Sequence, residues 1–294
     1  MIWKDREQSS NVDDRRYSNT SSSGGGGSMP SLGTMMFLFP IIKRLLGTKL
    51  GMGVVAIGAV AYFMGFNPFS SSSSSQSLSK PSAQEEEQAK FISTVLRDIE
   101  IVWGDIFKAH GSVYKEPKVV LYRGNTMGGC GEAKSDMGPF YCPADESVYI
   151  DLGFFDELQK KHNAGGDFAA AYVLAHEIGH HVQNRAGTLR KVHAAQGKVG
   201  EKDGNALQVR VELQADCYAG LWAAQAQKRF NMLEEGDIDE ALNTASAIGD
   251  DTLQKEAQGY AIPDSFTHGS SAERSGWFRK GFEGGTLESC DTFR

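Results

Sequence analysis

The chain lacks an excess of basic residues, which limits the partners it can have. Its 37 Asp and Glu outnumber its 30 Lys and Arg, so the formal net charge is −7. Residues 81–294 carry this imbalance, with 33 acidic and 22 basic side chains and no basic patch among aromatic residues. Nucleic-acid binding requires positive charge to meet the phosphates. We therefore expect no nucleic-acid partner.

Cysteine is also scarce, and no Cys-x-x-Cys pair is present, which argues against a zinc site built from thiolates. Four widely spaced cysteines fit an exported domain, in which thiols oxidise. Three pairings are possible. We favour one bridge across a Gly-rich turn and one that ties the C-terminus to the middle of the domain, over four separate buried thiols. The favoured pairs are Cys130–Cys142 and Cys217–Cys290.

Charge is absent from Leu50 to Phe66, a run long enough to span roughly 26–30 Å as a helix. Basic residues precede the run and serines follow it. The sequence therefore predicts an uncleaved transmembrane helix at 47–69, with the N-terminus in the cytoplasm and the rest outside. A cleavable signal is one alternative, because Ala59-Val60-Ala61 fits an A-x-A site. A buried core helix is the other.

The rest of the chain divides around this segment, and no internal repeat is visible. Residues 1–34 are polar and rich in Ser and Gly, and we expect residues 1–46 to form a disordered, basic cytoplasmic tail. A short docking motif at its charged start is the alternative. We expect residues 70–84 to form a Ser-rich linker. Residues 85–294 remain as one folded domain.

Within that domain, residues 176–180 contain the pattern H-E-x-x-H. On a helix, residues four apart share a face, so His176 and His180 can bind one zinc ion through their imidazole nitrogens. Glu177 lies beside that face, where it can act as a general base toward water. The alternative is a helix that carries two surface histidines by chance.

A zinc ion that performs hydrolysis keeps three protein ligands, so a third group must come from elsewhere in the chain. Glu212 and Asp216 stand four apart in an apolar setting, where a buried acid pair requires a cation. We predict that Glu212 is the third ligand. Asp216 is expected to accept a hydrogen bond from the ring N–H of a ligating histidine.

Hydrophobic periodicity predicts few strands beside many helices. Strands are expected at 119–122 and 147–152, and the strand near Tyr149 to Leu152 could align a substrate by edge pairing. Helices are expected at 85–110, around 154–158, from Asp167 to Gly187, at 207–230, at 241–248 and at 272–282. This is an α+β pattern with two zinc-bearing helices packed together.

The chain resembles the bacterial putative neutral zinc metallopeptidases, membrane-anchored proteins of the gluzincin kind. The resemblance implies a mostly helical, zincin-like catalytic domain with a small β-sheet at the inner (cytoplasmic) membrane, its N-terminus cytoplasmic and its catalytic domain periplasmic. In the wider group, H-E-x-x-H and E-x-x-A-D carry the zinc. The resemblance rests on Trp3, residues 11–16, 137–145, 148–152, 176–181, 212–217 and 264–269.

That group also has a downstream segment similar to T-H-P-x-x-x-x-R, which corresponds to Thr267 to Arg274, with Gly269 in place of the proline. The resemblance makes His268 a candidate donor to the reaction's oxyanion, with Arg274 supporting it or binding substrate backbone. The alternative for His268 is a histidine bonded to its own loop. His181 lies off the metal-binding face and should point away from the ion.

These observations lead to one main hypothesis and two rivals. The main hypothesis is a membrane-anchored metalloendopeptidase with one Zn²⁺ per chain, protein or peptide substrates, and one helix in the inner membrane. The first rival is a catalytically silent, zinc-stabilised scaffold or chaperone-like module. The second is hydrolysis of a non-peptide amide, such as cell-wall material. The sequence does not indicate the oligomeric state.

Overall fold

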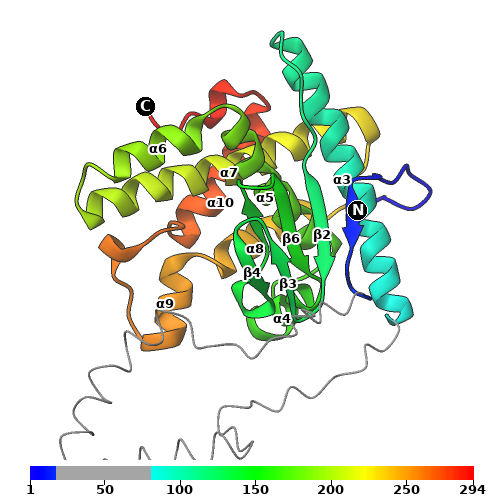
Figure 1. The fold of residues 1–294 in the computed structure, drawn as a ribbon, viewed down its shortest axis with the longest axis horizontal. Helices are drawn as coiled ribbons and strands as arrows, with labels where there is room; N and C mark the ends of the chain where they lie inside the picture. The colour runs from blue at the N-terminus through cyan, green and yellow to red at the C-terminus, as the bar shows by residue number, and fades with distance from the viewer. Residues whose placement is uncertain (18–80) are drawn as a thin grey trace, which may run out of the picture. The chain divides into compact units, whose positions relative to one another are not determined.

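The structure, a computed structural model, describes residues 1–17 and 81–294, which form a mostly helical unit with two small sheets (Figure 1). The larger sheet has the strand order β1–β2–β6–β5, with β5 antiparallel to β6 and the other pairs parallel. β3 and β4 form an antiparallel hairpin. The bounds are β1 Val12–Asp14, β2 Lys118–Tyr122, β3 Asn125–Gly128, β4 Gly131–Lys134, β5 Phe140–Cys142 and β6 Ser147–Asp151.

Alternation along the strands divides the core in two, because successive side chains point to opposite faces of a sheet. On one face, Val119 and Val148 join the main core with side chains of the helices. On the other face, Val120 and Tyr149 pack with Ala133 of the β3–β4 hairpin in a smaller cluster. Both faces are therefore apolar, which explains the continuous burial of β6.

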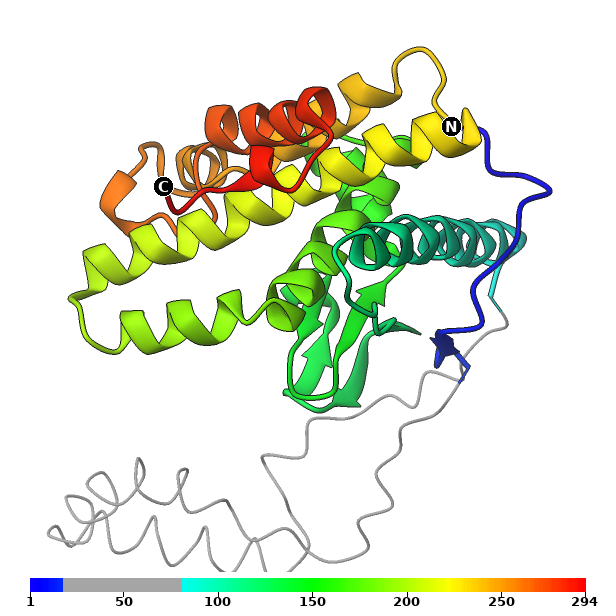
Figure 2. The ribbon, with the colours of Figure 1, turned by 90° about the horizontal axis from the view of Figure 1, so that it is seen from above.

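The helices that carry the sequence motifs are α5 and α7. The 30-residue α7 packs against α5 and α10, while α6 lies beside its first half (Figure 2). Close approach requires small residues: a Cβ at Gly281 would lie 1.9 Å from the Cys217 carbonyl oxygen. The bounds are α3 Ala83–Ala109, α4 Gly153–His162, α5 Asp167–Arg185, α6 Thr188–Gln196, α7 Glu201–Phe230, α8 Asp237–Ala247, α9 Asp250–Gln258 and α10 Ser271–Gly284.

Most of the predicted elements are present, and their ends differ by a few residues. α5 begins at Asp167 as expected and ends at Arg185, and α7 begins six positions earlier than expected. Ser270 caps α10, and Ser82 caps α3, each with a capping box. The periodicity did not predict the short elements β1, β3, β4, β5, α6 and α9.

The N-terminal segment, residues 1–17, is ordered on the domain, unlike the disordered tail expected for residues 1–46. β1 pairs with β2 in register Val12 to Val119. Ser9 donates a hydrogen bond of 2.6 Å to the buried carboxylate of Glu100. Arg16 is 1% exposed, pairs with Asp14 and donates to the backbone of α3. These specific polar contacts stabilise a segment whose composition alone argues against folding.

Replacing Arg16 with methionine should therefore lower the free energy of unfolding by about 1–3 kcal/mol, because buried hydrogen bonds to Asp14 and the Glu85 carbonyl are lost. Thermal or denaturant unfolding measures the change. Lys161→Met is the matched control, since Lys161 pairs with Glu157 in an exposed position where such pairs contribute little. Equal stability of the two variants would show that the segment is not held by Arg16.

The predicted transmembrane helix at 47–69 lies outside the described residues. Within residues 1–17 and 81–294, no helix is both long enough and apolar enough to cross a bilayer. For these residues we therefore correct the expected fold class to a mostly helical unit with small sheets, in which no described helix spans a membrane. The single-pass location is corrected with it. The β1–β2 pairing also contradicts the expected topology, which placed these two strands on opposite sides of a membrane.

Candidate metal centre and cleft

The two histidines of the H-E-x-x-H pattern lie on one face of α5 and point toward α7. A Cβ at Gly179 would lie 3.1 Å from the Cα of Ala215, so the two helices cross closely at this point. His176 is 6% exposed, and the ring of His180 lies 4.8 Å from it, centroid to centroid. The small residue between the histidines thus brings them within reach of the facing helix.

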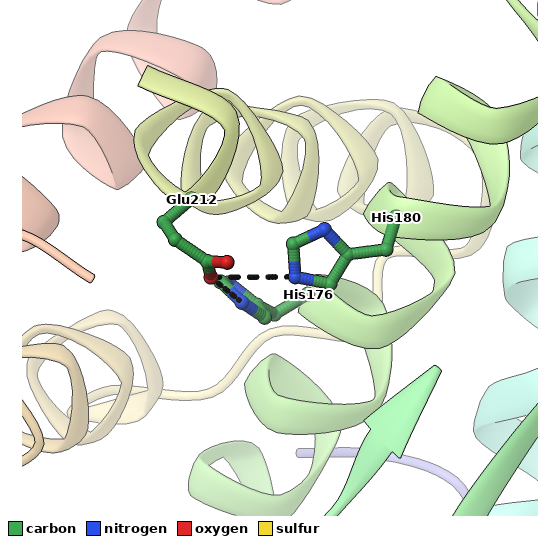
Figure 3. Close-up of side chains that lie close together, drawn as sticks. All are labelled: His176, His180 and Glu212. Atoms are coloured by element: carbon green, nitrogen blue, oxygen red, sulfur yellow. Dashed lines mark hydrogen bonds and ion pairs between the residues drawn. The ribbon is translucent and has the colours of Figure 1, made fainter. Parts of the chain in front are cut away.

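Glu212 of α7 completes a group of three converging donors (Figure 3). Its Oε2 lies 3.2 Å from His176 Nε2 and 3.3 Å from His180 Nε2. Ligands about 2.0–2.1 Å from a tetrahedral zinc ion lie roughly 3.3–3.4 Å from one another. Two imidazole nitrogens and one carboxylate oxygen are also the donor types that zinc prefers. The three side chains therefore fit zinc in both spacing and chemistry.

Each imidazole is held through its other nitrogen, so that its Nε2 faces the centre. His176 Nδ1 lies 2.7 Å from Asp216 Oδ1, and His180 Nδ1 lies 2.9 Å from Gln183 Oε1. The expected contact of Asp216 with a ligating histidine is thus present. Gln183 could not be identified from the sequence, because an amide three residues beyond a ligand is common on any helix.

Arg274 was expected to support His268 or to bind substrate backbone, but its hydrogen bonds go to Asp216 and its surroundings instead. It is 3% exposed, and its Nε and Nη2 donate to the two oxygens of Asp216 at 2.9 and 3.1 Å. Its remaining hydrogen bonds go to the hydroxyl of Tyr172 and the carbonyl of Ile248. Arg274 therefore fixes the carboxylate that orients His176. Tyr172, which sequence reasoning missed, donates to Asp216 at 2.6 Å.

The buried carboxylates of Glu212 and Asp216 give the cluster a negative charge that favours a cation. Burial lowers the pKa of His176, but Asp216 and Glu212 outweigh burial and raise that pKa to about 10. Burial likewise opposes ionisation of Glu212, yet the two histidines hold its pKa well below the usual range. The pKa of His180 is raised in the same way by Glu212, so both histidines favour their protonated forms when no metal is bound. Zinc affinity should accordingly rise with pH, because the ion displaces those protons.

The cluster lies at the floor of a cleft of about 840 Å³. Glu177 lines the cleft beside the ligands and is 8% exposed, and burial raises its pKa. A carboxyl group with a raised pKa is suited to accept and return a proton near neutral pH. Apolar side chains flank the floor on several sides, among them Phe140, Phe154, Leu189 and Leu253.

His268 also lines the cleft, and its side chain is 53% exposed. Its Nδ1 lies 3.2 Å from Asp250 Oδ1, while the other carboxylate oxygen of Asp250 accepts from the backbone N–H groups of residues 267–269. Gly269 has φ +98, which proline cannot adopt, so the local backbone differs from that of the T-H-P pattern. Asp250 is a third residue, after Gln183 and Tyr172, that sequence reasoning missed.

Tyr141 and His181 connect the zinc helix to the sheet. His181 points away from the metal centre, as expected, with Nδ1 3.1 Å from the Tyr141 hydroxyl and Nε2 2.7 Å from the Lys115 carbonyl. Tyr141 belongs to β5, the end strand of the sheet and part of the cleft wall. The edge-pairing role suggested for the strand near Tyr149 is therefore wrong, because β6 is paired on both sides.

Both favoured disulfides are present. Cys130–Cys142 joins the turn after β3 to β5, and Cys217–Cys290 joins α7 to the C-terminal segment. Because Cys217 follows Asp216 directly, the second bridge attaches the end of the chain next to the metal centre.

Comparison with known proteins gives matches along the whole chain. A family model described as "Putative neutral zinc metallopeptidase" matches residues 1–293. The chain is 47% identical over 296 residues to "Uncharacterized protein YpfJ" of Escherichia coli (strain K12), covering 100% of this chain and 99% of that protein. It is 42% identical over 206 residues to "Uncharacterized protein Rv2575" of Mycobacterium tuberculosis (strain ATCC 25618 / H37Rv), covering 66% of this chain and 67% of that protein. No solved structure matches.

Proposed function

Because the chain belongs to the family described as putative neutral zinc metallopeptidase, we propose that it is a zinc-dependent peptidase that hydrolyses peptide bonds in the cleft above His176, His180 and Glu212. The observation that carries the proposal is the convergence of these three donors at distances that suit one tetrahedral ion. A scaffold that needed zinc only for stability would not require an open cleft beside them.

When bound, zinc supplies a Lewis acid that activates water and polarises the scissile carbonyl. Glu177 is the general base: its carboxylate takes a proton from the attacking water and passes it to the leaving amine. Its low exposure favours this role, because burial raises the pKa of the carboxyl group and so strengthens it as a proton acceptor.

His268 is proposed to stabilise the negative charge that develops on the carbonyl oxygen. With Nδ1–H bonded to Asp250, only a protonated imidazole leaves a second N–H, at Nε2, for the substrate. The hydrogen bond to Asp250 raises the pKa of His268 and so favours this protonated form. The edge strand β5 lines the same cleft and could pair with an extended peptide.

Substituting Asp250 with asparagine tests this arrangement. We expect kcat to fall by about tenfold, because a weaker partner leaves less of His268 protonated. The protonated form exists below the pKa of His268 and is lost as pH rises through it. Removing the carboxylate lowers that pKa, so the alkaline limb of the kcat/KM profile should move to lower pH by about one unit.

The matched control is Asp251→Asn, one residue along the same helix. Asp251 accepts from the backbone and hydroxyl of Ser271 and does not contact the imidazole. The alkaline limb of the kcat/KM profile of Asp251→Asn should not move. An identical shift in both variants would point to general loosening of α9, and no shift in either would remove His268 from the mechanism.

A further inference from the structure

The two histidines of the metal centre differ in what holds them. The Nδ1 of His176 faces a carboxylate, whereas the Nδ1 of His180 faces the neutral amide of Gln183 at 2.9 Å. An amide can present either its oxygen or its nitrogen, so its orientation decides which nitrogen of His180 carries the proton. Gln183 is completely buried, so water cannot settle that choice.

The other hydrogen bonds of Gln183 determine the orientation of its amide. Its Nε2 donates to the Val211 carbonyl at 2.7 Å and to Gln214 Oε1 at 3.2 Å, which uses both of its donors. Gln214 in turn donates from Nε2 to the backbone carbonyl of Cys290 at 3.0 Å. Both amides are nearly or fully inaccessible to solvent, and every bond in this path joins a donor to an acceptor.

Only one direction satisfies the whole path. A backbone carbonyl can only accept, so Cys290 requires the nitrogen of Gln214, which turns the Gln214 oxygen toward Gln183. Gln183 must then offer its nitrogen to Gln214 and its oxygen to His180. His180 therefore keeps a proton on Nδ1. When zinc displaces the proton on Nε2, the Nε2 lone pair is directed at Glu212 and the centre.

We propose that Gln183 and Gln214 are positioning residues that transmit the fixed polarity of two backbone carbonyls, of Val211 and of Cys290, to His180 and keep it ready to bind zinc. The proposal rests on the proposed zinc site. It makes the C-terminal segment part of the metal centre, although the segment contributes no ligand. The Cys217–Cys290 bridge, anchored beside Asp216, holds that carbonyl in place. His176 is thus oriented by the carboxylate of Asp216, whereas His180 is oriented by Gln183, which is linked through Gln214 to the end of the chain.

The test compares two substitutions of the same kind on the same helix. Gln214 and Gln225 both lie on α7 and both donate from Nε2 to a backbone carbonyl of the C-terminal segment, but Gln225 reaches Gly285 and has no link to His180. Gln214→Met should weaken zinc binding about tenfold, and Gln183→Met about 10–100-fold, as for other partners of ligating histidines. Gln225→Met should leave zinc binding unchanged.

The dissociation constant for zinc is measured in the full-length apo protein by competition with a chelator. Cobalt replaces zinc in a second measurement, because its absorption spectrum reports the geometry of the ligands. Unfolding of each apo variant shows whether the fold is kept. A changed cobalt spectrum in the Gln183 and Gln214 variants, with a normal spectrum for Gln225→Met, is the expected result. Equal zinc affinity in all three variants would overturn the proposal.

The disulfide offers a second comparison. The variant Cys217→Ser/Cys290→Ser should lose zinc affinity severalfold. The variant Cys130→Ser/Cys142→Ser should not, because the Cys130–Cys142 bridge has no connection to His180. Unchanged affinity in the first variant would show that the bridge does not hold the carbonyl. Failure of the proposed function is distinguishable: wild-type protein would then not bind zinc, or Glu212→Gln would bind it as tightly as wild type.

Discussion

Replacing Glu177 with glutamine is expected to abolish peptide hydrolysis while zinc stays bound. The substitution keeps the size of the side chain but removes the group that accepts and returns the proton. General acid–base groups contribute about 10²–10⁴-fold, so kcat should fall by that factor. Zinc content should not change, because the three donors that converge on the site are His176, His180 and Glu212.

Replacing Glu212 with glutamine is the matched comparison, because it is expected to affect zinc binding as well as activity. Both glutamates are buried and both belong to the cleft, but only Glu212 lies within 3.3 Å of the imidazole nitrogens. Glu212→Gln should therefore lose zinc and activity together, whereas Glu177→Gln loses activity alone. Metal analysis of the purified protein and hydrolysis of an unfolded protein substrate measure the two quantities.

Three other outcomes would change the interpretation. Full activity of Glu177→Gln would mean that another group is the base. Absence of hydrolysis in the wild type, with a cellular phenotype that Glu177→Gln retains, would favour the zinc-stabilised scaffold. Hydrolysis of a cell-wall amide but of no peptide would keep the zinc chemistry and change the substrate class.

Local spacing allowed the metal centre to be predicted, since every ligand lies at a helical i, i+4 position. His176 and His180 fix one face of α5, and Glu212 and Asp216 fix one face of α7. The residues that complete the site could not be found in this way. Asp250 reaches His268 across 18 positions, and Gln183 reaches Gln214 across 31. Such contacts depend on tertiary packing, which periodicity does not encode.

The N-terminal segment shows the opposite limitation. Averaged composition predicts disorder, because the segment has little apolar surface to bury. Its order depends instead on a few specific partners: Ser9 meets Glu100, Arg16 meets Asp14, and three residues extend the sheet beside β2. The partners outside the segment lie far along the chain, Glu100 at 91 positions from Ser9 and Glu85 at 69 from Arg16, so no local pattern predicts them.

Removing the guanidinium of Arg274 should have the largest effect on stability. Asp216 is completely buried, and Arg274 is its only cationic partner apart from His176 among the described hydrogen bonds and ion pairs. Arg274→Met leaves this carboxylate without its bidentate partner, which typically costs about 3–5 kcal/mol in the free energy of unfolding. Arg274→Lys should not rescue it, because an ammonium cannot form the two parallel bonds.

A double-variant comparison identifies the cause of this loss. Arg274→Met/Asp216→Leu removes both charges, so its apo form should be more stable than the single Arg274→Met variant, although His176 then loses the partner that orients it. Arg279→Met, at an exposed position of α10, should change stability by less than about 0.5 kcal/mol. Denaturant unfolding of the apo proteins measures all of these values. If the double variant were less stable than Arg274→Met, the hydrogen bonds of Asp216 with Tyr172 and His176 would contribute more to stability than its unpaired charge costs.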